Sequence, residues 1–154
     1  MDKTQTIHYQ EYTLAELDAR DRALIEAAVE AADTAYAPYS NFHVGAALRL
    51  VDGTVVKGSN QENIAYPSGL CAERTALFSA SAQHPGVAVE TLAIIGRNPQ
   101  GELTAASPCG ACRQVMAEQE SRQGNKLRVL CYYSDYKILL FEGVESLLPF
   151  IFTM

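Results

Sequence analysis

The hydrophobic positions along the chain follow two periods, one typical of helices and one typical of buried strands. Apolar residues recur at spacings of three, four and seven between Leu17 and Ala31, which predicts an amphipathic helix over about 14–36. A capping box at Thr13–Glu16 marks its expected start, because hydroxyl and carboxylate groups satisfy the free amides of a first helical turn. The turn sequence Ala37–Ser40 is expected to end this helix.

The rest of the chain alternates short apolar runs with further helical segments. Two runs rich in strand-forming residues, 42–51 and 54–57, flank Asp52-Gly53 and predict a hairpin. Apolar runs predict buried strands at 91–96, 127–133 and 137–141, and helices are expected at 71–83, 109–120 and, as a short one, 143–148. Strands separated by helices predict an α/β fold, a single domain over residues 1–154 with three α/β/α layers and a central mixed five-stranded sheet.

Composition and charge narrow the classes of function. The chain has 154 residues, of which 48% are hydrophobic and 19% charged, as is typical of a globular protein. Its net charge is -6 and its basic residues form no stripe, which favours a small ligand over nucleic acid. The N-terminus lacks the apolar core of a signal peptide, and no apolar stretch approaches the roughly 20 residues of a membrane span. We therefore expect a cytoplasmic protein without membrane contact, in which four cysteines indicate metal binding or catalysis rather than disulfides.

Three of the four cysteines stand where helices are expected to begin. Cys109 and Cys112 are three residues apart, so on a first helical turn their sulfurs lie on one side and can chelate one ion. Cys71 supplies a third sulfur, and three thiolates leave one position of a zinc tetrahedron open, as in catalytic sites. Cys131 lies inside an apolar run and is expected in the core.

Glu73 adds an acid–base group to the three cysteines. It follows Cys71 by two residues, a spacing at which side chains diverge within a helix, although at a helix start Cys71 can reach off the end of the axis. Zinc lowers the pKa of a bound water to about 7, and Glu73 would take and return its proton. A lone C-x-x-C pair would fit a structural zinc site or a redox pair equally well. Together, the four residues predict a hydrolytic zinc site.

Several segments resemble the cytidine deaminase family in its small homotetrameric form. They are PYSNFHVGAAL at 38–48, GSNQENIAY at 58–66, CAERTAL at 71–77 and SPCGACRQV at 107–115. The resemblance runs from about 15 to 152 and leaves residues 1–12 outside.

This resemblance implies a homotetramer with one zinc ion per subunit, held by Cys71, Cys109 and Cys112, with Glu73 as proton shuttle, in line with the signature of zinc deaminases in general. It implies hydrolytic deamination at C4 of the base, converting cytidine and 2′-deoxycytidine to uridine and 2′-deoxyuridine plus ammonia in pyrimidine salvage. Nothing in the sequence ranks one of these two nucleosides above the other.

The resemblance also implies contacts to the nucleoside. Asn60 and Glu62 match the pair that holds the ribose hydroxyls, and their amide and carboxylate groups suit a diol. Phe42 matches an aromatic residue that packs against the pyrimidine. The backbone amide of Ala72 would face the carbonyl of the base.

Two further matches concern the thiolates and the neighbouring subunit. Arg74 matches a residue that hydrogen-bonds to the thiolates, whose summed negative charge would otherwise weaken zinc as a Lewis acid. Phe152 matches an aromatic residue that covers the site of an adjacent subunit. The chain departs from the pattern at Ser59, where a cysteine is frequent, and at 67–70, an unusual approach to Cys71.

Two alternatives remain open from the sequence. A deaminase of another amino-heterocycle, such as a nucleoside antibiotic or an adenosine in RNA, would use the same zinc site. Asn60 and Glu62 favour a free nucleoside over RNA, as does the acidic net charge. A non-catalytic zinc-binding assembly module would need a fourth protein ligand, and the sequence offers no convincing one.

Overall fold

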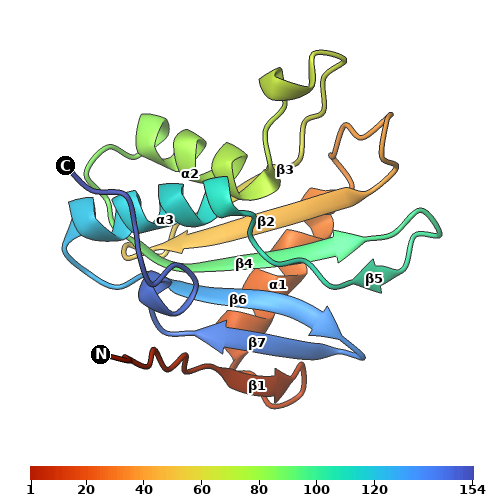
Figure 1. The fold of residues 1–154 in the computed structure, drawn as a ribbon. Coiled ribbons are helices and arrows are strands. Elements are labelled where there is room, and N and C mark those ends of the chain that lie inside the picture. The colour runs from red at the N-terminus through yellow and green to blue at the C-terminus, as the bar shows by residue number, and fades with distance from the viewer.

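The computed structural model describes residues 1–154 and has three layers, with helices on both faces of one sheet (Figure 1). The strands are β1 (Gln10–Thr13), β2 (His43–Leu50), β3 (Val55–Ser59), β4 (Val89–Arg97), β5 (Leu103–Thr104), β6 (Arg128–Ser134) and β7 (Lys137–Phe141). The helices are α1 (Ala19–Ala32), α2 (Ala72–Gln83) and α3 (Gly110–Gln123), with short 3-10 turns η1 (Tyr66–Ser68) and η2 (Val144–Ser146). No helix is long and apolar enough to cross a membrane.

The sheet is mixed, as expected. Its order is β1-β7-β6-β4-β2-β3, with β5 paired to β4. Only β4 and β6 run parallel, and every other pair is antiparallel. Alternation along β2 sends Ala47 to the face covered by α1 and Ala46 and Leu48 to the face covered by α2 and α3 (Figure 1). The two apolar clusters on these faces form the core.

The sheet has seven strands, so the expectation of five was wrong in number. The five expected strands are present, and β1 and β5 are additional. β5 spans two residues, which is too short for any hydrophobic pattern. β1 is an exposed edge strand without apolar alternation, held to β7 by backbone pairing, by an ion pair between Glu11 and Lys137, and by contact of the Tyr9 and Phe141 rings.

The first helix is shorter than the predicted range of 14–36. Thr13 does bond to the carboxylate of Glu16, but the residues that follow form a turn. Arg22 explains this difference, because its guanidinium donates to carbonyl groups of that turn. The helix begins at Ala19, with the side chain of Asp18 accepting from the amide of Asp21.

The other predicted helices differ less. α2 and α3 begin directly after Cys71 and Cys109, which confirms both expected helix starts. α3 runs on to Gln123, where Gly124 takes a left-handed conformation with φ 70° and ends the helix as such a glycine commonly does. The segment predicted as a short helix at 143–148 holds only the 3-10 turn η2.

α2 lies very close to β3 because β3 contains a glycine at the contact. A Cβ atom on Gly58 would stand 2.5 Å from the Ala76 nitrogen and 2.6 Å from the Ala72 oxygen. Any side chain at this position would therefore push the first turn of α2 away from the sheet. Gly58 thus sets the position of the helix start that carries Cys71.

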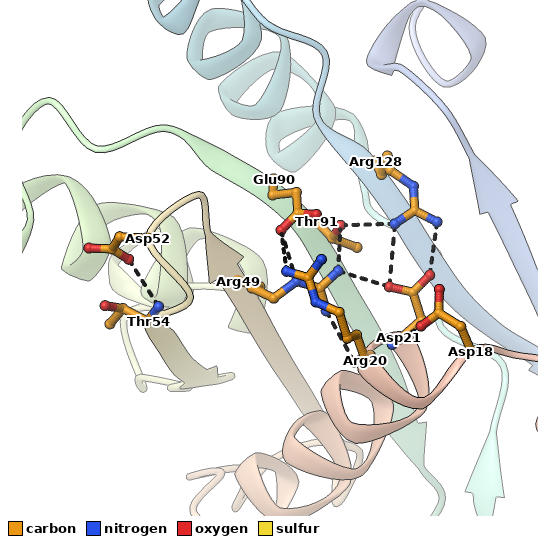
Figure 2. A network of polar contacts seen from close by, with 9 residues as sticks. All are labelled: Asp18, Arg20, Asp21, Arg49, Asp52, Thr54, Glu90, Thr91 and Arg128. Carbon is orange, nitrogen blue, oxygen red and sulfur yellow. Dashed lines mark hydrogen bonds and ion pairs between the residues drawn. The ribbon is translucent and has the colours of Figure 1, made fainter.

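A buried ion network joins α1 to the sheet (Figure 2). Asp21, 2% exposed, accepts from Arg49 at 3.0 Å and from Arg128 at 2.8 Å. Arg49 also bonds to Glu90 at 2.9 Å, and both arginines reach the Thr91 hydroxyl. Burial alone would raise the pKa of Asp21, but the hydrogen bonds from Arg128 and Arg49 outweigh it and hold the pKa below its ordinary value.

Replacing Asp21 by asparagine is expected to lower the free energy of unfolding by about 3 kcal/mol at pH 7, because it leaves the buried Arg49 without a full counter-charge. The pKa of Asp21 is depressed in the folded state, so its contribution is complete above about pH 4, the pKa of an unfolded aspartate, and is lost as pH falls below that value. Urea unfolding at pH 7 and pH 3 should therefore show a smaller difference between variant and wild type at pH 3. Glu26→Gln on the exposed side of α1 is the control, and an equal effect of both variants would contradict the prediction.

Candidate metal centre and active site

Two helix starts carry the cysteine motifs. Cys71 and Cys109 are the N-cap residues of α2 and α3, both with extended backbone (φ -70°, ψ 155° and φ -68°, ψ 167°). Neither side chain caps its own helix, so both sulfurs are free to reach outward. The positive end of each helix dipole stabilises negative charge at this point. The local conformation therefore favours thiolates where metal ligands were expected.

The three sulfurs form one compact cluster. Sγ atoms of Cys71 and Cys109 are 3.8 Å apart, those of Cys109 and Cys112 are 3.5 Å apart, and all three lie within 4.8 Å of one another. Tetrahedral ligation with Zn–S bonds near 2.3 Å would separate sulfurs by about 3.8 Å. No cysteine is in a disulfide. The donor set and its spacing thus fit a single zinc ion.

The cluster is electrostatically prepared to hold negative charge. Hydrogen bonds with the Cys112 thiol and with Arg74 together lower the pKa of the Cys71 thiol to about 5, against the effect of burial. The hydrogen bond between the two cysteines raises the pKa of Cys112. Arg74 donates from Nη2 to the Cys71 sulfur at 3.6 Å. The expected neighbour of the thiolates is therefore in contact with one of them.

Glu73 is buried beside the cluster, with 4% of its surface exposed. Burial, together with the negative charge of Cys71, raises the pKa of Glu73 to about 7. Such a carboxyl group can exist in both protonation states near neutral pH. Cys71 precedes the first turn of α2, so its side chain can lie beside that of Glu73 although the two residues are only two positions apart.

A cavity of about 380 Å³ joins the metal cluster to the predicted nucleoside contacts. It is lined by seven of the ten residues predicted for the site, namely Phe42, Asn60, Glu62, Cys71, Ala72, Glu73 and Cys109. Cys112, the third cysteine of the cluster, is buried. Phe42 directly precedes β2, Asn60 and Glu62 follow β3, and the other four residues lie at the starts of α2 and α3. A ligand of nucleoside size would therefore contact both groups of residues.

Asn60 fixes the start of β2. Its Oδ1 accepts from the amide of Val44 at 2.7 Å, and its Nδ2 donates to the carbonyl of Phe42 at 2.9 Å. The Phe42 ring packs over Gly96, where a Cβ atom would stand 2.9 Å from the ring tip. The oxygen and the nitrogen of the Asn60 side-chain amide each have one hydrogen-bonding position left. Asn60 can thus hold Phe42 and a ligand at the same time.

Glu62 is held at the rim of the cavity by the loop before β2. Its Oε1 accepts from the amides of Tyr39 and Ser40, at 2.9 and 3.2 Å. Its Oε2 accepts from the Ser40 hydroxyl at 2.5 Å. The hydrogen bond from Ser40 is the main cause of the lowered pKa of Glu62. Glu62 therefore faces the cavity as a fixed carboxylate.

One predicted site residue lies elsewhere in the subunit. Phe152 is 75% exposed and does not line the cavity of its own chain. Its backbone is tied to α3 by two hydrogen bonds with the Gln114 side chain, both 3.1 Å. Cys131 is 1% exposed in the core, as expected.

Some residues of the cavity were not predicted from the sequence. Ser40, Val44 and the segment 105–107 also line it. Ser40, Val44 and Ser107 lie inside the motifs that carry the family resemblance, so position within those motifs was the available signal. Ala106 is held to β6 by its amide, which donates to Tyr132 at 3.0 Å, a contact that no local pattern indicates.

The unusual approach to Cys71 forms part of the rim. Tyr66–Ser68 make the turn η1, and Gln61 pairs with Leu70 through two backbone hydrogen bonds. The ring of Tyr66 meets that of Tyr39 edge to face, with centroids 5.8 Å apart. The segment thus borders a second hollow of about 530 Å³ that shares Asn60, Glu62 and Cys71 with the first.

The fold and site define a class of protein, a three-layer α/β hydrolytic enzyme with a three-thiolate metal centre and a buried carboxyl group. The family model described as "Cytidine and deoxycytidylate deaminase zinc-binding region" matches residues 18–124. The chain belongs to this cytidine and deoxycytidylate deaminase family. The family binds zinc, and the three-cysteine cluster fits one zinc ion per subunit.

Individual relatives and solved structures similar to this chain carry the name cytidine deaminase. A cytidine deaminase of Halalkalibacterium halodurans is 48% identical over 97 residues, 62% of this chain and 68% of the relative. A probable cytidine deaminase of Dictyostelium discoideum is 32% identical over 129 residues, 84% of this chain and 81% of the relative. The crystal structure of a cytidine deaminase from Burkholderia pseudomallei superposes with a TM-score of 0.72 at 45% identity, covering 84% of this chain and 97% of that one.

Proposed function

We propose that the protein catalyses hydrolytic deamination of cytidine and 2′-deoxycytidine to uridine and 2′-deoxyuridine, with release of ammonia. The observation that carries this proposal is the single cavity shared by the cysteine cluster, Glu73, Asn60 and Glu62. It combines a hydrolytic metal centre with hydrogen-bonding groups for a sugar diol. The names of the relatives support cytidine as a substrate.

Cys71, Cys109 and Cys112 are proposed to hold the zinc ion. Zinc supplies Lewis-acid chemistry at such sites and makes water a nucleophile at neutral pH. Arg74, which donates to the Cys71 sulfur, partly offsets the negative charge of three thiolates. The cysteines themselves are thus proposed to bind metal and to take no part in proton transfer.

Glu73 is proposed to move the proton. From its buried position beside the cysteines it takes a proton from the water that attacks C4 and gives it to N3 of the cytosine ring. It then takes the proton of the new hydroxyl group at C4 and gives it to the amino group, which leaves as ammonia. The free amides at the start of α2 include that of Ala72, which is proposed to donate to the carbonyl of the base. Phe42 packs against the ring face, and Asn60 and Glu62 bind the ribose hydroxyls.

Ammonia release from cytidine, 2′-deoxycytidine, adenosine and blasticidin tests the substrate class. Activity with both cytosine nucleosides and none with the other two is expected. Activity confined to blasticidin would favour the antibiotic deaminase instead. A zinc-loaded protein that turns over none of the four would favour the zinc-binding assembly module.

Replacing Glu62 by glutamine is expected to raise the KM for cytidine by about tenfold or more with a smaller change in kcat, because a hydrogen bond to a charged group is lost in substrate binding. Steady-state kinetics at saturating and limiting cytidine separate the two constants. Glu118→Gln on the exposed side of α3 is the control. A fall in kcat at unchanged KM would contradict a role of Glu62 in binding.

We also propose an oligomeric state and a cellular compartment for the protein. A homotetramer is proposed, in which Phe152 of one copy covers the cavity of another, in keeping with the exposure of Phe152. Sedimentation at micromolar concentrations tests this state. A cytoplasmic role in pyrimidine salvage is proposed as well, which agrees with four unpaired cysteines.

A further inference from the structure

The Glu62 carboxylate accepts three hydrogen bonds at the rim of the cavity. It is half-buried at the rim, where an acidic side chain ordinarily keeps some freedom to move in solvent. Three donors from two consecutive residues nevertheless converge on it, the amides of Tyr39 and Ser40 and the Ser40 hydroxyl. Converging backbone amides of this kind are typical of anion-binding concavities.

The Ser40 hydroxyl has a defined direction in this arrangement. Its oxygen accepts from the amide of Phe42 at 3.1 Å, so its proton is free to be donated to Oε2 of Glu62. Asn41, between the two, adopts a left-handed conformation with φ 51°, which asparagine tolerates better than most residues. The turn thereby places Ser40 between the backbone of Phe42 and the carboxylate.

The three hydrogen bonds use most of the acceptor positions of the Glu62 carboxylate. An ionised carboxylate has about two acceptor positions on each oxygen. Both positions on Oε1 are used by backbone amides, and the Ser40 hydroxyl uses one on Oε2. One position of Glu62 therefore remains for a donor from outside the chain.

We propose that Ser40 is a positioning residue for substrate, which acts through Glu62 by leaving its Oε2 a single open direction toward a ribose hydroxyl. This inference rests on the proposed function, because it concerns the nucleoside that Glu62 would bind. Removing the hydroxyl leaves Oε2 with two open positions, so water competes and the carboxylate orientation is less restricted. A residue that only stabilised the loop would affect all substrates alike.

The test compares Ser40→Ala with wild type on cytidine and on 2′,3′-dideoxycytidine, which lacks the 2′- and 3′-hydroxyls. The KM for cytidine is expected to rise about fivefold, as for a weakened charged hydrogen bond, with kcat within about twofold. The KM for the dideoxynucleoside should stay within about twofold of wild type, since neither hydroxyl of the 2′,3′-diol remains to be positioned. Ser121→Ala, on the exposed side of α3, is the control.

A double-mutant cycle separates positioning from loop stability. In a Glu62→Ala background, Ser40→Ala should change the KM for cytidine no further, because the group it acts through is gone. Thermal unfolding of each variant checks folding, and Ser40→Cys, with a weak donor of similar size, should give an intermediate KM. Equal rises for both nucleosides, or a full additional effect without Glu62, overturns the inference while the proposed function stands. Wild-type protein that does not deaminate cytidine overturns both.

Discussion

Replacing Glu73 by glutamine is expected to remove almost all turnover of cytidine while zinc remains bound. The amide has the same shape in the buried site but cannot take up and return a proton. General acid–base groups contribute about 10²- to 10⁴-fold to rate, so kcat should fall by at least that range. The fall should appear in kcat, because the substrate contacts proposed for Asn60, Glu62 and Phe42 are untouched.

Turnover of cytidine and zinc content measured on the same preparations check this prediction. Glu118→Gln on the exposed side of α3 should retain wild-type values of both. A Glu73→Gln protein with zinc bound and more than about a tenth of wild-type kcat would contradict the proton-transfer role.

Replacing Cys112 by serine is expected to remove zinc and activity together. Cys112 is fully buried, and without its thiol only two sulfurs would remain for the ion. A serine hydroxyl is not among the usual zinc ligands in proteins. Because metal binding adds to folding stability, the melting temperature of the variant should fall below that of the zinc-loaded wild type.

Cys131→Ala is the matched control, because Cys131 is also buried but belongs to the core of the sheet. This variant loses some packing and should keep one zinc ion per chain and its activity. The zinc content per chain, measured by atomic emission after dialysis, distinguishes Cys112→Ser from Cys131→Ala. Full zinc content in Cys112→Ser would contradict the assignment of the three-cysteine cluster.

The metal centre could be predicted because its determinants are local. The spacing of Cys109 and Cys112 and the helix starts at Cys71 and Cys109 depend on a few neighbouring residues. Helical periodicity then indicated which side chains share a face. The structure brings the three sulfurs together, although their meeting depends on the packing of two helices distant in sequence.

Features that depend on distant partners were missed or only partly predicted. β1 exists because β7 offers an unpaired edge, and nothing in its own sequence indicates a strand. α1 begins late because Arg22 binds the carbonyls of the preceding turn. The hydrogen bond from Ser40 to Glu62 joins residues 22 positions apart, and neither residue type indicates the other. The roles proposed for Asn60, Glu62 and Phe42 rest on family resemblance rather than on a physical pattern in the sequence.

An ultraviolet assay of cytidine conversion to uridine, with and without a zinc chelator, tests the zinc-dependent deamination. The purified protein should convert cytidine, lose this activity as the chelator removes zinc, and regain it when zinc is restored. The melting temperature should follow the same cycle. Full activity after complete removal of zinc, or no conversion by the zinc-loaded protein, would contradict zinc-dependent cytidine deamination.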